Sequence, residues 1–268
     1  EIKPDFANAH YNLGKTLKDL GKLKEAELSY RKAIKIKPDY SFAHYNLGNT
    51  LKDLGNLQEA ELSYRKAIEI KPDFALAHNN LGTILSDLGK LEEAELSTSK
   101  AVELNPDLPE AYANLGNILR ESGELQKAKE AYKKSLGIDP KQIHLISKII
   151  YTLSKLCMWD EIEKYLPSLN RIGIEGMAVE PLTLMYIEDN PLNHLKRAKK
   201  YDKERRREEL PNINCKNKNK INIGYFSSDF KNHPITHLLI RTLELHDKSK
   251  FKIYAYSLSE AKDDYTMR

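Results

Sequence analysis

Four asparagines recur at one fixed spacing and are the first residues whose type suggests chemistry. Asn12, Asn46, Asn80 and Asn114 follow one another at intervals of 34 residues. An asparagine amide carries both a hydrogen-bond acceptor and donors, so a row of them can pair with an extended peptide backbone whatever its side chains. Alternatively, each asparagine stabilises helix packing or a local turn. The spacing predicts a peptide-binding ladder and leaves the packing role open.

A histidine near the C-terminal end of the sequence is the second candidate. His233 lies in the tripeptide Asn232-His233-Pro234, shortly after Ser227-Ser228-Asp229. Histidine titrates close to neutral pH, so its ring can accept a proton from an attacking hydroxyl group. Taken alone, a histidine before proline more often starts a helix or packs. A Ser-His-Asp hydrolase is disfavoured because Ser228 is not in a Gly-x-Ser-x-Gly turn.

The ladder asparagines belong to a larger repeating unit. The segment from Ala7 to Tyr40 returns three more times, each time with apolar residues at helical spacing on both sides of a glycine turn. Each unit predicts two amphipathic helices that must stack on the next unit to bury their apolar stripes. The pattern resembles the tetratricopeptide repeat family, whose arrays place the ladder position on their inner surface. The matching positions of the first unit are Leu13, Gly14, Leu17, Ala26, Tyr30, Ala33 and Pro38.

Three segments follow the four regular units. Residues 143–176 keep apolar spacing but lose the Asn-Leu-Gly triplet and the closing proline, which predicts a degenerate terminal repeat. Residues 177–220 predict a helical, charged linker, and its run from Leu195 to Glu209 is either a solvated helix or a patch for an acidic partner or nucleic acid. Beyond residue 220, Ile221–Phe226 and Phe251–Tyr256 predict strands around a helix at Ile235–His246, a βαβ unit with parallel strands.

Composition narrows the class of protein. The 43 basic and 39 acidic residues give a net charge of +4 and are interspersed, which indicates a solvated surface and disfavours nucleic acid as partner. No apolar run reaches the roughly 20 residues that span a bilayer, so we expect no membrane association and a cytoplasmic location. Cys157 and Cys215 lack metal-ligand spacing.

Three histidines also recur with the period of the repeat. His10, His44 and His78 occupy equivalent positions in successive units. Packed helices lie about 8 to 10 Å apart, whereas metal–ligand bonds are about 2 Å long, so equivalent positions cannot share one ion. We therefore predict a packing role and no metal site.

The C-terminal segment resembles a known catalytic region. Residues 221–239 are similar to the opening of the catalytic region of the O-linked N-acetylglucosamine transferase family, through Ile223-Gly224-Tyr225, the stretch Ser227 to Phe230, and Asn232-His233-Pro234. That family places tetratricopeptide repeats directly before a catalytic region of two Rossmann-like lobes. The resemblance implies that His233 is catalytic, that the acceptor peptide lies in the repeat groove, and that donor-binding residues lie beyond residue 268.

The sequence thus predicts an all-α tetratricopeptide-repeat solenoid at residues 1–142, a degenerate terminal repeat at 143–176 and a linker at 177–220. Residues 221–268 are predicted as the truncated βαβ start of a Rossmann-like α/β glycosyltransferase lobe. The resemblance implies metal-free transfer of N-acetylglucosamine from UDP-GlcNAc to Ser or Thr hydroxyls of proteins, with the UDP-sugar as donor substrate and no cofactor. The alternative is a non-catalytic scaffold whose repeats bind peptides or partner proteins.

Overall fold

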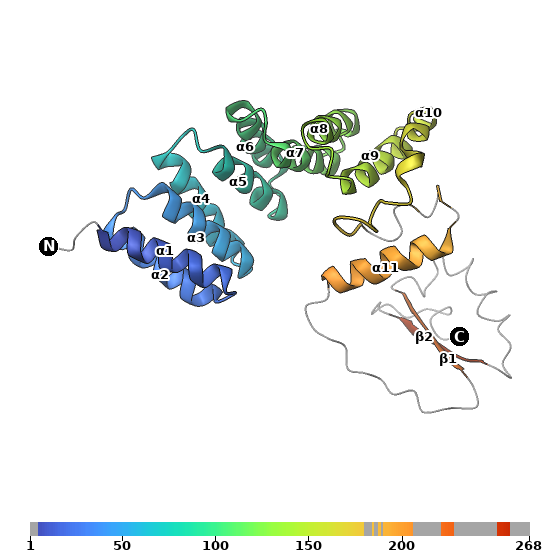
Figure 1. The fold of residues 1–268 in the computed structure, drawn as a ribbon, viewed down its shortest axis with the longest axis horizontal. Coiled ribbons are helices and arrows are strands. Elements are labelled where there is room, and N and C mark those ends of the chain that lie inside the picture. The colour runs from blue at the N-terminus through green and yellow to red at the C-terminus, as the bar shows by residue number, and fades with distance from the viewer. Residues whose placement is uncertain are drawn as a thin grey trace. The chain divides into compact units, whose positions relative to one another are not determined.

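The computed structural model describes residues 5–179, 184, 187–188, 190–205, 221–227 and 251–257. The chain divides into two compact units, residues 1–206 and residues 207–268, which are considered separately. The first unit contains the predicted solenoid, built from consecutive helix pairs (Figure 1). The paired helices are α1 (Asp5–Asp19), α2 (Leu23–Ile36), α3 (Ser41–Asp53), α4 (Leu57–Ile70), α5 (Ala75–Asp87), α6 (Leu91–Leu104), α7 (Pro109–Glu121) and α8 (Leu125–Ile138).

Glycine and proline set the limits of the helices in each pair. Between α1 and α2, Gly21 adopts a φ of 74°, and Gly55 adopts 83° between α3 and α4. Residues with a Cβ atom avoid this left-handed conformation, so glycine permits the tight turn between the two helices. Helix α2 ends at Ile36, before Pro38, because proline has no amide hydrogen to continue the helical bonding.

Small residues and one aromatic ring form the core of each pair. Ala26, Tyr30 and Ala33 of α2 are fully buried. Part of the predicted apolar stripe behaves differently in the first unit, because Leu13 is 49% exposed whereas its equivalent Leu47 is 5% exposed. Among the described residues no helix precedes α1, so the face that an earlier pair would cover meets water. The stripe is thus buried only where units stack on both sides.

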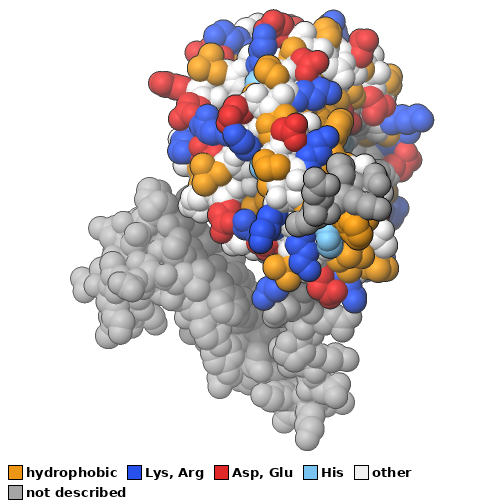
Figure 2. All heavy atoms as spheres, turned by 90° about the vertical axis from the view of Figure 1, so that its left-hand side faces the viewer, with side chains coloured by type: hydrophobic (Ala, Val, Ile, Leu, Met, Phe, Trp, Pro, Cys, Tyr) orange, Lys and Arg blue, Asp and Glu red, His pale blue; other side chains and the backbone are white. Residues whose placement is uncertain are grey.

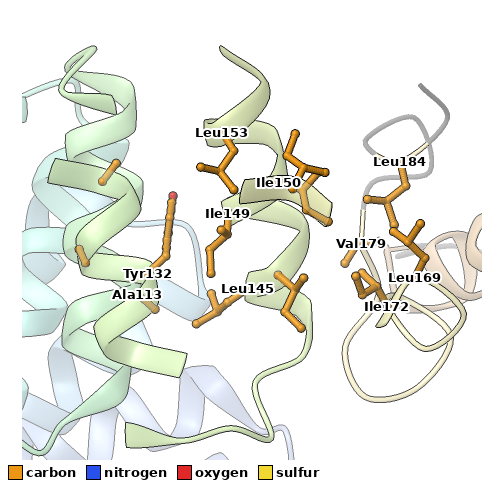
Figure 3. Close-up of a cluster of buried hydrophobic side chains, with 14 of the residues drawn as sticks. Ala113, Tyr132, Leu145, Ile149, Ile150, Leu153, Leu169, Ile172, Val179 and Leu184 are labelled. Carbon is orange, nitrogen blue, oxygen red and sulfur yellow. The ribbon is translucent and has the colours of Figure 1, made fainter. Parts of the chain in front are cut away.

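A less regular segment follows the fourth pair, as the degenerate-repeat prediction expects. Its elements are α9 (His144–Lys155), α10 (Trp159–Ile162) and the 3₁₀ helix η1 (Glu163–Ser168). Leu145, Ile149 and Leu153 of α9 are fully buried in one cluster with Ala113 and Tyr132 of the fourth pair (Figure 3). This helix therefore covers the end of the regular array with large aliphatic side chains.

Helix α11 (Pro191–Arg205) is anchored by one buried cation. Arg197 is fully buried, and its guanidinium donates to the carbonyl oxygens of Leu169 and Ile172 and to the Glu188 carboxylate. Burial alone raises the pKa of Glu188, but the hydrogen bonds from Arg197 and Asn193 outweigh burial and lower this pKa below its usual value. The charged run predicted as a solvated helix therefore has one face fixed to the protein.

The second unit contains a pair of parallel strands. Strand β1 (Ile221–Ser227) pairs with β2 (Phe251–Ser257), with Ile221 opposite Phe251. Both strands coincide with the apolar runs of the sequence, whereas the intervening run at Ile235–His246 lies outside the described residues. The complete βαβ unit therefore stays a prediction. Among the described helices, none combines the length and the apolar character needed to cross a membrane.

Candidate functional site

The predicted ladder runs along the first helices of successive pairs. Asn12 lies on α1, Asn46 on α3, Asn80 on α5 and Asn114 on α7. Hydrogen bonds between side chains join each of these helices to the next. The first helices therefore lie side by side, and the ladder forms a row across them. The side chain of Asn12, at the start of the row, is exposed.

Three ladder asparagines use one amide hydrogen to hold the preceding unit. The Nδ2 atom of Asn46 donates to the hydroxyl of Tyr11 at 3.0 Å. Asn80 donates to the hydroxyl of Tyr45 at 3.2 Å and to Oδ1 of Asn49 at 2.8 Å. These asparagines therefore pack the units together, which was the alternative to peptide binding. The sequence could have indicated the tyrosine partners, because Tyr11 and Tyr45 are themselves 34 residues apart.

The fourth ladder residue makes a related bond. Asn114 donates from Nδ2 to Oδ1 of Asn79 at 3.0 Å, and Asn79 occupies the position that Tyr11 and Tyr45 hold in the first two units. An asparagine amide can make up to four hydrogen bonds, so these contacts leave capacity for a ligand. The half-buried ladder amides are thus held in fixed orientations by their neighbours while part of their bonding capacity stays available.

A polar cleft of about 250 Å³ lies at the C-terminal part of the ladder. It is lined by residues of α5, α7 and α9, including Asn114, Asn117, Asp87 and Glu121. Burial raises the pKa of Asp87, the Lys52 ammonium opposes that change and the Glu121 carboxylate adds to it. The cleft therefore combines neutral amides with two nearby carboxylates. It suits a polar ligand that can donate hydrogen bonds.

Lys148 ends the amide ladder. It stands 34 residues after Asn114, and its Nζ atom donates to Oδ1 of Asn117 at 2.6 Å. The Tyr132 hydroxyl donates to the same oxygen at 3.0 Å, and burial raises the pKa of Tyr132 to about 12, so this hydroxyl keeps its proton at neutral pH. Asn117 and Lys148 were not among the predicted site residues. Their 34-residue relation to Asn49, Thr83 and Asn114 is the signal that identifies them.

Opposite charges alternate beside the ladder. Lys18 forms an ion pair with Asp53 of the next unit at 3.1 Å. In the third unit Ser86 replaces the lysine, and its hydroxyl donates to Glu121 at 2.8 Å. Acidic and basic side chains are likewise interspersed over the described part of the face shown in Figure 2. The groove is therefore polar and mixed in charge, as its sequence predicts.

The recurring histidines make local bonds. The Nε2 atom of His44 lies 2.9 Å from the carbonyl oxygen of Pro38, and that of His78 lies 3.0 Å from the carbonyl oxygen of Pro72. Both rings thus connect a first helix to the proline that closes the preceding unit. In the described residues, no group of three or more His, Cys, Asp or Glu side chains could hold a metal ion.

His233, the predicted catalytic residue, lies outside the described residues, as do Asn232 and Pro234. Strand β1 ends at Ser227, a few residues before this tripeptide. A histidine in a loop after a parallel strand occupies the edge at which open α/β sheets bind ligands. Its assignment therefore stays a prediction based on sequence.

Comparison with protein families identifies both parts of the chain. The model described as "Tetratricopeptide repeat" matches residues 7–40, 41–74, 75–108 and 109–142. The model described as "Glycosyl transferase family 41" matches residues 200–268. A curated relative from Caenorhabditis elegans, UDP-N-acetylglucosamine--peptide N-acetylglucosaminyltransferase, is 40% identical over 47 residues. This match spans 18% of the present chain and only 4% of the relative.

Solved structures share the fold of the array. The MamA protein superimposes with a TM-score of 0.57 at 22% identity, covering 78% of this chain and all of its own. YrrB, described as a TPR protein with an unusual peptide-binding site, superimposes with a TM-score of 0.51 at 23% identity, covering 71% of this chain and 90% of its own. With four consecutive matches over its first half, the chain belongs to the tetratricopeptide repeat family, and residues 200–268 carry a family 41 glycosyltransferase match.

Proposed function

We propose that this chain is part of a glycosyltransferase that moves N-acetylglucosamine from UDP-GlcNAc to Ser or Thr hydroxyls of proteins. The observation that carries the proposal is the presence, in one chain, of four tetratricopeptide repeats and a family 41 match directly after them. The name of the Caenorhabditis elegans relative describes this class of reaction, and its 40% identity over 47 residues supports the assignment. A cytoplasmic location fits transfer to protein hydroxyls.

The proposed division of labour follows the segments of the chain. Residues 1–142 and the degenerate repeat at 143–176 hold the acceptor protein, and residues 177–220 connect this array to the catalytic region. Residues 221–268 begin a Rossmann-like lobe. The parallel pairing of β1 with β2 supports this last assignment, because parallel strands require a crossover connection of a dozen or more residues.

The proposed reaction is a direct displacement. The acceptor hydroxyl oxygen bonds to the anomeric carbon of the sugar from the face opposite UDP, while the bond from that carbon to the UDP oxygen breaks. The hydroxyl proton passes to a base, and His233 is our candidate because imidazole titrates near neutral pH. Donor-binding residues are proposed to lie beyond residue 268. UDP-GlcNAc acts as a substrate, without a metal or cofactor.

The catalytic proposal is tested in the intact protein by following transfer of labelled N-acetylglucosamine from UDP-GlcNAc to protein and peptide acceptors. His233→Ala is expected to lower kcat by about 100-fold or more if His233 is the general base. The control is His10→Ala, which removes a histidine from the array. An unchanged rate for His233→Ala would remove this residue from the mechanism. Failure to transfer sugar to any acceptor would argue against the function itself.

The groove proposal is tested by the double variant Asn46→Ala with Asn80→Ala. It is expected to weaken binding of a labelled acceptor peptide at least about tenfold in fluorescence anisotropy, because two positioned amides are lost. The control is Asn56→Ala with Asn170→Ala, which removes two exposed amides outside the ladder.

A second control separates binding from packing, since the ladder amides also bind tyrosines. Tyr11→Phe with Tyr45→Phe removes the hydroxyls that accept from Asn46 and Asn80 but leaves both amides in place. If this variant loses peptide binding as fully as the asparagine variant, the ladder acts through packing and the groove proposal fails. Thermal unfolding midpoints show whether each variant remains folded.

The non-catalytic scaffold is the alternative function. One observation favours it: the ladder and the polar cleft are complete within α1 to α9 and need nothing from the C-terminal unit. A scaffold predicts that the intact protein binds peptides through Asn46 and Asn80 but neither transfers sugar nor hydrolyses UDP-GlcNAc. Transfer that depends on His233 would exclude it.

A further inference from the structure

A second cleft lies on α11, away from the ladder helices. It has a volume of about 630 Å³ and is lined by Ile174, four lysines and one glutamate. The lysines occupy i, i+3, i+4 and i+7 positions, so they form one face of the helix. We call this surface the lysine cleft, and its charged members are Lys196, Lys199, Lys200, Lys203 and Glu204.

The lysine cleft is held in a defined orientation. On the other side of α11, the buried Arg197 fixes the helix to the carbonyl oxygens of Leu169 and Ile172. Within the cleft, Lys200 Nζ donates to the carbonyl oxygen of Ile174 at 3.0 Å and to that of Gly176. A ligand would therefore meet a helix that is already positioned, which reduces the entropy lost on binding.

The positive charge of the lysine cleft is poorly balanced. On the array, lysines commonly pair with carboxylates, as Lys90 does with Glu61 at 2.9 Å. Among the described residues, by contrast, Lys196, Lys199 and Lys203 form no ion pair. The cleft's only carboxylate, Glu204, accepts a hydrogen bond from the Ala178 amide at 2.9 Å and lies 3.9 Å from Lys200. Like charges at these spacings repel one another, so an anion bound here would relieve the repulsion.

We propose that the lysine cleft binds an acidic segment of a partner protein. The lysines extend over about 10 Å of helix, a distance that an extended peptide crosses in about three residues. Lysine ammonium groups are flexible point charges suited to carboxylates on such a chain. The described lining contains no aromatic ring on which a nucleic-acid base could stack. The site goes beyond the proposed transferase function and does not depend on it.

The test uses the full chain and a fluorescein-labelled hexaglutamate peptide, with a hexaglutamine peptide for comparison. Fluorescence anisotropy is expected to show binding of hexaglutamate, weakened by salt, and no binding of hexaglutamine. The triple variant Lys196→Glu, Lys199→Glu, Lys203→Glu is expected to weaken hexaglutamate binding at least about tenfold. The matched control is Lys24→Glu, Lys32→Glu, Lys134→Glu, which makes the same charge change at exposed positions of the array. This control is expected to retain binding.

Several results would overturn the proposal. Equal losses in both triple variants would show that only the overall charge matters, and equal binding of hexaglutamine would show that charge is irrelevant. Tighter, cleft-dependent binding of a short single-stranded DNA or of phosphatidylserine vesicles would assign the cleft to another class of ligand. Circular dichroism spectra and thermal midpoints of both variants establish that binding is compared between folded proteins. A selective loss in the cleft variant supports the proposal.

Discussion

At the scale of single residues, the closest contact in each helix pair joins a glycine to the residue opposite. A Cβ atom added at Gly48 would lie 2.7 Å from the ring of Tyr64, and the first and fourth pairs repeat this contact. The third pair has Thr98 instead of tyrosine, and its hydroxyl oxygen would lie 1.9 Å from a Cβ at Gly82. Because both partners exclude a methyl group, glycine is required whichever residue faces it.

We predict opposite effects for the same substitution at two helical glycines. Gly48→Ala should lower the free energy of unfolding by about 1 to 3 kcal/mol, because the fully buried Tyr64 ring must move. Gly137→Ala in α8 meets no atom within 4 Å and should raise stability by about 0.5 to 1 kcal/mol through helix propensity. Urea unfolding of the two variants measures both changes. Similar destabilisation by both would show that the glycine–tyrosine contact is not limiting.

At the scale of elements, the sequence predicts what is periodic and misses what is not. The helix pairs follow from the spacing of leucines, alanines and glycines, and the ladder from Asn46 and its equivalents. The anchor of α11 does not follow, because Arg197 lies in a run of charged residues that predicts a solvated surface. Its partners are backbone carbonyls at Leu169 and Ile172, whose positions depend on an irregular segment. Tertiary contacts of this kind leave no local pattern.

The anchor of α11 should make its docking sensitive to acid. The pKa of Glu188 is lower in the folded protein than its usual value of 4.5, so its ionised form contributes stability above that value. This contribution is lost as the pH falls through the lower folded pKa. We expect the amides of 191–205 to lose protection from hydrogen exchange below about pH 4.5, after correction for intrinsic exchange rates.

Glu188→Gln is the control for this prediction, because it keeps a hydrogen-bond acceptor but cannot ionise. The variant should protect α11 less than the natural protein at neutral pH, and the two should converge in acid. His194 lies 3.5 Å from the Arg197 guanidinium and is present in both proteins, so its protonation cancels in the comparison. An acid-induced loss of equal size in both proteins would assign the effect to other groups.

At the scale of the whole molecule, the first unit behaves as a row in which each pair supports only its neighbours. Inter-unit contacts such as Asn46 with Tyr11 and Arg31 with Glu59 join adjacent pairs. In such arrays, stability is the sum of terms for each unit and each interface. The end of the row therefore matters, since an uncovered terminal pair exposes its apolar face. Helix α9 provides this cover for the fourth pair.

We predict that removing α9 destabilises the array more than a single core substitution does. In a chain ending at residue 142, the cluster around Tyr132 loses Leu145, Ile149 and Leu153, each worth about 1.5 to 3 kcal/mol when buried. A chain ending at residue 206 retains them, and Ile149→Ala in that chain should cost about 2 to 5 kcal/mol. Urea unfolding followed by far-ultraviolet circular dichroism compares the three. Equal stability of the 142-residue and 206-residue chains would contradict the capping role, because α7 and α8 would then be stable with that face in water.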